Sequence, residues 1–230
     1  MNNGIQKLFS QVPKTYESIN HLLTFGLDIV WRKRTARLAA KEGGSRWLDV
    51  CCGTGEMADY LRRKAPGGTV VYATDFTMPM LKEALAKPKG EKIKFVLSDV
   101  KTLPYPEKTF DLMTISFATR NINLSRDILI QTFSEFHRVL RPNGLFYNLE
   151  TSQPGWTVIK SLFHLYIARF VRSIGSRISG SKAAYTYLSR TIPRFYTAEE
   201  LEEILRQAGF HAVDVKKMLF GVAAIHRAQK

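Results

Sequence analysis

The stretch Trp47–Glu56, with the sequence Trp-Leu-Asp-Val-Cys-Cys-Gly-Thr-Gly-Glu, constrains the fold of this chain more than any other. Its first four residues predict a short buried strand, the next five predict a tight turn, and the apolar spacing that follows is typical of a helix. Glycines in such a turn let the backbone bend sharply and approach a ligand that a Cβ would exclude. The first N–H groups of the new helix also point toward that ligand. We therefore expect Gly53 and Gly55 to border a bound group, while Asp49, late in the strand, can accept hydrogen bonds from the turn or from a cation.

The next acidic strand end indicates what that group is. Asp75 ends the apolar run 70–74, about twenty residues after the turn, where a carboxylate can accept hydrogen bonds from both hydroxyls of a ribose. A phosphate-binding loop does not fit, because no lysine follows Gly55. A dinucleotide-binding turn most often has a third glycine where Ala58 stands, although alanine is also allowed there. The pattern favours adenosine held by a doubly wound sheet; an ordinary turn between strand and helix is the alternative.

The residues Leu48–Gly55 resemble the first motif of the S-adenosylmethionine-dependent class I methyltransferases. The resemblance implies an α/β fold with a doubly wound, mostly parallel, seven-stranded Rossmann-like sheet that ends in an antiparallel C-terminal hairpin. It implies S-adenosylmethionine as the cofactor, with S-adenosylhomocysteine as the product. The donor contacts that it implies are Gly53, Gly55, Asp75, Asp99, Val100 and Ser116.

Three further positions bear on the donor side. Asp99 follows the expected third strand, 93–97, where it could accept the exocyclic amine of adenine or simply cap a loop. Met80 could rest on the adenine, although a methionine at helical spacing more often belongs to the core. The family's donor-side threonine is Ala58 in this chain, so that hydroxyl contact is lost or replaced.

Other stretches resemble a narrower family, the ubiquinone/menaquinone biosynthesis C-methyltransferases. Residues 16–31 are similar to its N-terminal signature, residues 115–121 to its Ile-Ser-Phe-Gly-x-Arg-Asn run, and residues 138–152 to its second signature. The departures from these signatures are Glu17, Ile19, Thr24, Asp28, Ala118 and Asn143. The largest is Asp28, which stands where the family has histidine and removes any role of that histidine.

This resemblance implies methyl transfer from S-adenosylmethionine to a ring carbon of a prenylated quinol, for example a demethylmenaquinol. The ring carbon becomes nucleophilic when a neighbouring hydroxyl loses its proton, and a cation beside that oxygen stabilises the phenolate. We expect Arg120 to be that cation, with a surface salt bridge as the alternative, Asn121 to orient the hydroxyl, and Tyr16 to close the site. Arginine stays protonated, so water, His21 or His164 would take the proton. No metal site is expected, because the histidines, cysteines and carboxylates lack ligand spacing.

The chain organisation predicts one methyltransferase domain over residues 1–230. With 230 residues, 45% of them hydrophobic, the chain fits one domain with an insertion better than two domains. Residues 1–42 would form a helical cover over the donor site, and residues 151–196 a basic helical insertion on the acceptor side. A capping box at Thr197–Glu200 predicts a helix that Gly209 ends, and two strands around Gly221 predict the closing hairpin.

The net charge of +14 raises the question of an acidic partner. Residues 151–198 contain no Asp or Glu and interleave seven basic residues with apolar ones. Such a basic amphipathic segment suits an anionic membrane surface; RNA phosphates or a core-packed helix with a basic edge are the alternatives. An RNA methyltransferase is disfavoured, because no Asn-Pro-Pro-Tyr-like motif follows the expected fourth strand, 112–116, and no stacking platform is evident. A methyltransferase of another prenylated or aromatic acceptor stays open, as does a homodimer.

The expected location is the cytoplasm, peripheral on the inner face of the membrane. The first seven residues contain no apolar signal core, and no apolar run approaches the roughly 20 residues that span a bilayer. Cys51 and Cys52 are adjacent, which suits neither a structural disulfide nor a zinc site, so we expect them to pack the turn.

Overall fold

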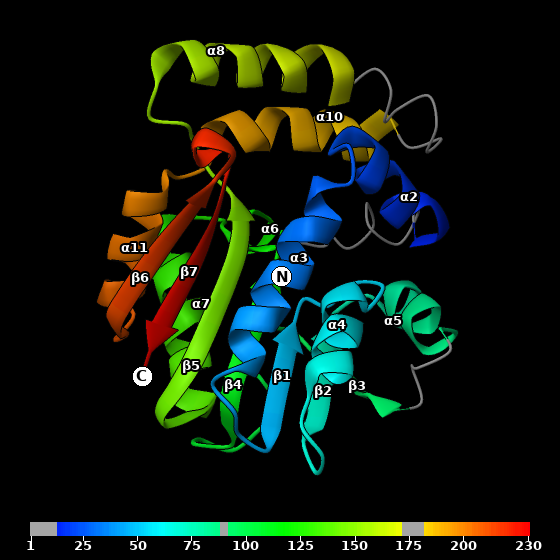
Figure 1. The fold of residues 1–230 in the computed structure, drawn as a ribbon, viewed down its shortest axis with the longest axis vertical. Helices are drawn as coiled ribbons and strands as arrows, with labels where there is room; N and C mark the ends of the chain where they lie inside the picture. Colours follow the sequence, from blue (N-terminus) through cyan, green and yellow to red (C-terminus); the bar gives the residue numbers. More distant parts are fainter. Residues whose placement is uncertain (1–12, 88–91, 172–181) are drawn as a thin grey trace.

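Seven strands form one sheet in the order β3-β2-β1-β4-β5-β7-β6 in the computed structural model, which describes residues 13–87, 92–171 and 182–230 (Figure 1). Strands β1 to β5 run parallel to their neighbours, whereas β7 is antiparallel to β5 and β6 is antiparallel to β7. The bounds are β1 Arg46–Val50, β2 Val70–Asp75, β3 Lys94–Leu97, β4 Phe110–Ser116, β5 Leu140–Thr151, β6 His211–Met218 and β7 Ala223–Gln229. This is the predicted α/β sheet with its antiparallel C-terminal hairpin, and β4 lies beside β1.

Helices cover both faces of the sheet. The described helices are α2 Pro13–Leu23, α3 Leu27–Ala40, α4 Glu56–Lys64, α5 Met78–Leu85, α6 Thr119–Ile122, α7 Arg126–Val139, α8 Thr157–Tyr166, η2 Ile167–Val171, α10 Lys182–Thr191, η3 Ile192–Arg194, α11 Ala198–Gln207 and η4 Leu219–Gly221. Apolar residues of α3 and α4 form one core with the sheet, and those of α7 and α11 form a second core. The central strand β1 is buried on both faces, as a parallel strand between two helical layers must be, which explains its apolar run Trp47, Leu48 and Val50.

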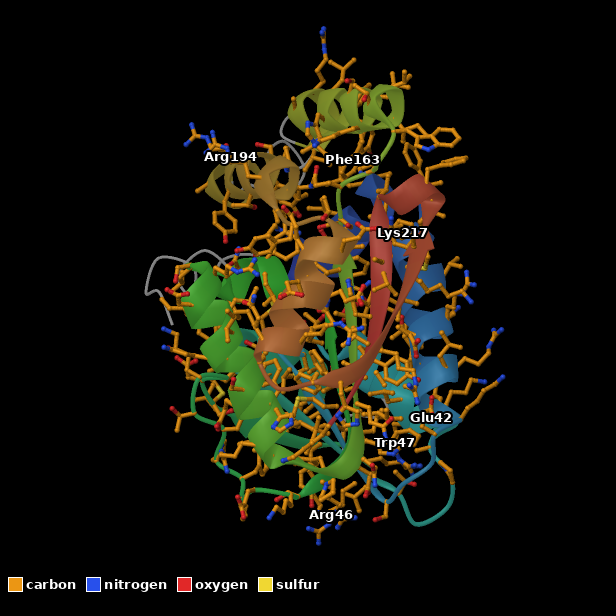
Figure 2. All side chains as sticks on the ribbon, turned by 90° about the vertical axis from the view of Figure 1, so that its left-hand side faces the viewer. Glu42, Arg46, Trp47, Phe163, Arg194 and Lys217 are labelled. Carbon is orange, nitrogen blue, oxygen red and sulfur yellow. The ribbon has the colours of Figure 1, made fainter. Side chains whose placement is uncertain are left out.

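A third core lies beyond the carboxyl ends of the parallel strands, where ligands bind in such sheets (Figure 1). It joins α2 to the segment after β5, because Ile19 and Leu23 pack with residues of η2, α10 and η3. Helix α8 forms the outermost layer at this end and contributes no fully buried residue. Figure 2 shows Phe163 and Arg194 at this end of the molecule and Arg46 at the opposite end. Among the described residues, no helix is long and apolar enough to cross a membrane.

Strand β5 differs from the sequence-based prediction. The sequence suggests a helix to Leu140, a turn at residues 141–144 and a strand from Leu145, but α7 ends at Val139 and β5 begins at Leu140. Residues 141–144 are part of β5 because the pairing with β4 begins at Leu140, opposite Phe110, and resumes at Leu145, opposite Leu112, after a register shift. Asn143 takes a left-handed backbone with φ of 63° at this bulge, a conformation that asparagine tolerates. The predicted capping box at Thr197 and Glu200 is confirmed.

Candidate active site

A cleft lies at the carboxyl ends of β1, β2 and β4. Its walls come from the turn after β1, the ends of β2 and β4, and helices α3, α4, α5 and α6. The described lining residues are Arg32, Cys51, Cys52, Gly53, Thr54, Glu56, Met57, Asp75, Phe76, Thr77, Met80, Ser116, Phe117, Ala118, Asn121 and Ile122. We call this the donor cleft. It brings together five of the predicted site residues: Gly53, Asp75, Met80, Ser116 and Asn121.

Asp75 ties the turn after β1 to the end of β2. One carboxylate oxygen accepts the Gly53 N–H at 2.9 Å and the other accepts the Thr77 N–H at 2.8 Å. Burial raises the pKa of Asp75, while the backbone hydrogen bonds from Gly53 and Thr77 oppose that rise. The carboxylate therefore shapes the glycine turn and lines the cleft at the same time.

The two glycines of the turn both have positive φ, 54° at Gly53 and 80° at Gly55, but their surroundings differ. A Cβ at Gly55 would lie 3.0 Å from the Cβ of Ala84, so this glycine is needed for packing against α5. A Cβ at Gly53 would meet no described atom within 4 Å. Gly53 thus leaves open space beside the cleft, into which a bound ligand can approach the backbone.

This difference predicts opposite phenotypes for two alanine variants. Gly53→Ala is expected to cost about 1 kcal/mol of unfolding free energy from its positive φ, yet to weaken donor binding at least about tenfold by filling the approach to the backbone. Gly55→Ala adds the clash with Ala84 and is expected to lose about 2–4 kcal/mol. Urea unfolding and calorimetric titration with S-adenosylhomocysteine measure the two effects. Equal donor affinity of Gly53→Ala and the wild type would contradict this account of the turn.

Asp49 lies beneath the turn rather than on the cleft wall. Its side chain is buried, and one oxygen accepts the Thr114 hydroxyl of β4 at 2.6 Å. The other oxygen has no hydrogen-bond partner among the described residues. Burial raises the pKa of Asp49 to about 7, with Thr114 opposing the rise. The hydroxyl of Thr114 on the neighbouring strand is a partner that the sequence did not predict.

Other predicted donor contacts lie outside the described lining of the cleft. Gly55 faces α5, as described above. The side chain of Val100 is buried in the core with α7 and α11, and Asp99 accepts the Lys101 N–H at 3.0 Å. Tyr16 belongs to α2, but its side chain falls outside the part of the chain that the structure describes. Cys51 and Cys52 are free thiols in the turn, and burial raises the pKa of both, which keeps them protonated.

A second, mostly apolar cavity of about 350 Å³ lies beside the donor cleft. Its described lining residues come from α2, α3, α6, α8, η2, α10 and the loop at η4, together with the ends of β4 and β5. The polar ones are Asn20, Thr24, Asp28, Arg32, Arg120 and Thr151. We call this the acceptor cavity. Its volume falls in the range of about 300–1,000 Å³ that is common for small-molecule sites.

Arg32 and Phe117 line both spaces and separate them. The guanidinium carbon of Arg32 lies 4.9 Å from the centre of the Phe117 ring, and the Trp31 ring packs on Phe117 at 6.2 Å. Phe117 follows β4 with φ of 55°, an uncommon backbone conformation for an aromatic residue. A group in the donor cleft and a group in the acceptor cavity would therefore meet at this residue.

Arg120 and Asn121 lie on the short helix α6, and their side chains line different spaces. Arg120 lines the acceptor cavity, where its Nη1 contacts Glu150 at 3.1 Å and the Thr151 hydroxyl at 2.9 Å. Glu150 is fully buried, so this is a buried ion pair and not the surface salt bridge that was the alternative. The Nε of Arg120 and the Oδ1 of Asn121 are buried without a hydrogen-bond partner among the described residues. Unsatisfied buried polar atoms are costly, so both atoms are candidates for ligand contacts.

Known proteins are similar to this chain in sequence. The model of the ubiE/COQ5 methyltransferase family matches residues 1–230. The chain belongs to the ubiE/COQ5 methyltransferase family. A protein named demethylmenaquinone methyltransferase from Thermus thermophilus is 37% identical over 221 residues, covering 95% of this chain and 98% of the relative. A protein of the same name from Geobacillus kaustophilus is 33% identical over 229 residues, covering 98% and 96%.

A solved structure is similar in fold. A SAM dependent methyltransferase from Aquifex aeolicus matches with a TM-score of 0.58 at 19% identity, covering 81% of this chain and 82% of the other. Together these findings confirm the predicted family, fold, methyl donor and enzyme class. The chain is an S-adenosylmethionine-dependent methyltransferase, and C-methylation in quinone biosynthesis, the function expected from the sequence, is confirmed with it.

The donor cleft of this ubiE/COQ5 methyltransferase fits S-adenosylmethionine chemically. Gly53 offers an open approach to the backbone, Asp75 offers a carboxylate for hydroxyls, and the buried Oδ1 of Asn121 offers an acceptor that the protein leaves unsatisfied. These three groups fit a polar ligand that carries both hydroxyl and amino groups.

The two histidines expected as proton acceptors do not line either space in this methyltransferase. His21 Nδ1 contacts Asp28 at 2.9 Å, and its Nε2 lies 3.3 Å from Glu56. His164 contacts Gln153 at 2.8 Å. Neither histidine is among the described lining residues of the cleft or the cavity, so the structure does not bring either to the acceptor.

Four residues at the candidate site of this methyltransferase were not predicted from the sequence. They are Arg32, Glu56, Phe117 and Glu150. Glu150 could have been found, because it stands in the Leu-Glu-x-Ser stretch that resembles the family's second signature. Arg32 sits in a run of three basic residues that reads as a solvated surface, and its sequence carries no signal that the guanidinium is buried.

Proposed function

We propose that this methyltransferase transfers the methyl group to a ring carbon of demethylmenaquinol or a closely related prenylated quinol. The observation that carries the proposal is the acceptor cavity, whose lining is divided between a few polar side chains, among them Arg32 and Arg120, and a larger number of apolar ones. That division suits a ring with hydroxyl groups at the inner end and a hydrocarbon tail along the apolar wall. The relatives named demethylmenaquinone methyltransferase support this choice of ring.

The chemistry requires a nucleophilic ring carbon next to the donor. S-adenosylmethionine supplies a methyl group on a positively charged sulfur. A bond forms from the ring carbon to this methyl group, the sulfur–methyl bond breaks, and the ring proton leaves to water. Arg120 lines the acceptor cavity and stabilises the phenolate through its guanidinium, while Glu150 and Thr151 hold the guanidinium in place through Nη1. Phe117 and Arg32 border both spaces, so they position the two reactants against each other.

The tail would leave the cavity through an exposed apolar rim. Phe25, Leu162, Leu219 and Phe220 line the acceptor cavity and are also exposed to solvent. Next to them, Trp156 is 71% exposed and packs on Phe220 with ring centres 6.3 Å apart. We call these five residues the rim. A cluster of exposed aromatic and aliphatic residues around a cavity mouth is suited to the interface of a bilayer.

The charges around the rim favour an anionic surface. Lys160, Arg169, Arg190 and Arg194 are exposed at this end of the molecule, within a segment that contains no Asp or Glu. Figure 2 places Arg194 beside the end formed by α8 and α10. Anionic lipids attract such side chains by about 1 kcal/mol each near the membrane surface. We therefore propose peripheral binding at the cytoplasmic face of the membrane, where a prenylated quinol resides; RNA binding would leave the apolar rim unexplained.

The rim predicts a loss of membrane binding on substitution. Trp156→Ser/Phe220→Ser is expected to lower the apparent affinity for vesicles with anionic lipid at least about tenfold, because each large side chain contributes about 1.5–3 kcal/mol when buried. Vesicle co-sedimentation measures this. Leu85→Ser, which removes an equally apolar exposed residue from α5, is the matched control and should bind like the wild type. Equal vesicle binding by all three proteins would contradict the assignment of the rim.

An acceptor comparison tests the proposed substrate. The purified protein would receive S-adenosylmethionine and reduced demethylmenaquinols with no tail, one isoprene unit or two units, in detergent or vesicles. Because each buried CH₂ contributes about 0.8 kcal/mol, kcat/KM should rise at least about tenfold from the tailless ring to the two-unit substrate. Turnover that ignores the tail would contradict the assignment of the acceptor cavity, and turnover only with another ring would identify a different acceptor.

A further inference from the structure

The charges on the wall of the donor cleft are few and complementary. Among its described lining residues, the charged ones are Arg32, Glu56 and Asp75. Asp75 stands at the end of β2, the position suited to ribose hydroxyls. The cleft wall therefore has one further cation, Arg32, which lies over the Phe117 ring, and one further carboxylate, Glu56, which directly follows the glycine turn.

Arg32 and Glu56 come from different elements and meet at the cleft. Arg32 lies on α3, and Glu56 is the first residue of α4, directly after Gly55. Both side chains are largely buried, with exposed fractions of 7% and 14%, and Nη1 of Arg32 lies 3.4 Å from Oε2 of Glu56. A charge-assisted hydrogen bond is usually about 2.7–2.9 Å long, so the longer Arg32–Glu56 contact is a weak one, and each side chain keeps hydrogen-bonding capacity for a ligand.

Arg32 is held firmly on its other sides. Its Nη1 donates to Asp28 at 2.5 Å, Asp28 also accepts the Thr24 hydroxyl at 2.6 Å, and the guanidinium lies over the Phe117 ring. Thr24, His21 and Arg32 all contact the buried Asp28 carboxylate, which ties α2 to α3. The Asp28 substitution in the N-terminal signature thus fixes the arginine at the cleft, and the guanidinium is preorganised there.

S-adenosylmethionine carries, away from its sulfonium, an amino acid end with one carboxylate and one ammonium. We infer that Arg32 binds this carboxylate and Glu56 binds this ammonium, so that the pair recognises the amino acid end of the donor. The planar guanidinium suits a carboxylate, and a carboxylate side chain accepts from an ammonium. This inference goes beyond the proposed function, which concerns the acceptor, and uses only the identity of the methyl donor.

A metal ion is the competing occupant of this region. Glu17, His21 and Glu56 each place one ligand atom within 4.8 Å of the others. However, Glu17 already contacts the Thr54 hydroxyl and the Lys87 ammonium, and His21 contacts Asp28. A lysine ammonium beside a carboxylate disfavours a further cation there. Burial raises the pKa of Glu56, with Arg32 opposing the rise, and an ammonium ligand would offset that burial.

Two ligands that differ only at the amino acid end test the inference directly. S-adenosylhomocysteine has this end, whereas 5′-methylthioadenosine keeps the adenosine and the thioether but lacks it. Calorimetric titration would compare both ligands on the wild type, Arg32→Met, Glu56→Gln and Asp75→Asn. We expect Arg32→Met to weaken S-adenosylhomocysteine at least about tenfold and Glu56→Gln about fivefold, with 5′-methylthioadenosine unchanged within about twofold. Asp75→Asn should weaken both ligands.

The outcomes separate this inference from the proposed function. Unchanged S-adenosylhomocysteine affinity in both Arg32→Met and Glu56→Gln would overturn the inference, as would an equal loss for the two ligands. Because Arg32→Met leaves the buried Asp28 without its arginine, Glu56→Gln provides the second test if Arg32→Met fails to fold. A wild-type protein that binds neither ligand would overturn the donor assignment itself, and with it the inference.

Discussion

Replacing Arg120 and Glu150 together, as Arg120→Met/Glu150→Gln, is expected to slow methyl transfer about 100- to 1,000-fold. The double variant removes the proposed phenolate-stabilising cation without leaving a buried charge behind, because Arg120 and Glu150 form a buried ion pair. Arg120→Met alone would leave Glu150 unpaired and cost about 3–5 kcal/mol of stability, which would confuse a loss of turnover with a loss of fold. Single-turnover kinetics with saturating donor and quinol measure the rate.

Two controls accompany this result: a variant of another arginine, and the donor affinity of the double variant. Arg126→Met removes an arginine from the start of α7, where it contacts Gln207 at the surface, and should turn over like the wild type. Affinity for S-adenosylhomocysteine should stay within about threefold in the double variant, since Arg120 lines the acceptor cavity and is not among the described residues of the donor cleft. A double variant that keeps more than about a fifth of the wild-type rate would contradict the role of Arg120.

Asp75→Asn is expected to weaken the binding of S-adenosylmethionine and S-adenosylhomocysteine about 30- to 100-fold. Hydrogen bonds to a charged group contribute about 1.5–3 kcal/mol, and the neutral amide would also turn an N–H group toward the N–H of Gly53 or Thr77. Asp127→Asn, which neutralises an exposed carboxylate at the start of α7, is the matched control. Calorimetric titration measures the affinities, and a loss smaller than about threefold would contradict the role of Asp75.

The same titration has a predicted pH dependence. Burial raises the pKa of Asp75 above its ordinary value of 3.8. If the ionised carboxylate binds the ribose, affinity is highest above this raised pKa and falls as the pH is lowered through it. The Asp75→Asn variant lacks this carboxylate, so its weaker affinity should lose that part of the pH dependence.

The sheet and the glycine turn that lines the donor cleft could be predicted because their signals are local. The apolar run of β1, the glycine turn and the acidic end of β2 follow one another within about thirty residues. This order is typical of a doubly wound sheet that binds a nucleotide at its glycine turn. The hairpin β6–β7 and the capping box at Thr197 were equally readable. In contrast, the start of β5 was missed because the pairing of Leu140 with Phe110 overrides the helical pattern and the proline that follows.

The acceptor side could be predicted only in outline because its contacts join distant segments. Ile19 and Leu23 of α2 pack with residues of η2, α10 and η3, and Arg120 pairs with Glu150 thirty residues away. The sequence pointed to Arg120 through a resemblance, but not to the carboxylate that neutralises it. Asp49 shows the same limit, because its place late in a strand suggests a contact with the turn or with a cation. Only the structure shows that its side chain is buried, and this burial raises its pKa to about 7 although the Thr114 hydrogen bond opposes the rise.

The position of the transferred methyl group tests the account most directly. The protein would be incubated with S-adenosylmethionine carrying a deuterated methyl group and reduced demethylmenaquinol with two isoprene units, in vesicles with anionic lipid. Fragmentation mass spectrometry would locate the label, and chromatography would count the S-adenosylhomocysteine formed. We predict a label on the quinol ring carbon and one S-adenosylhomocysteine for each methylated ring. A label on a quinol oxygen, or no labelled quinol from a protein that binds the donor, would contradict the account.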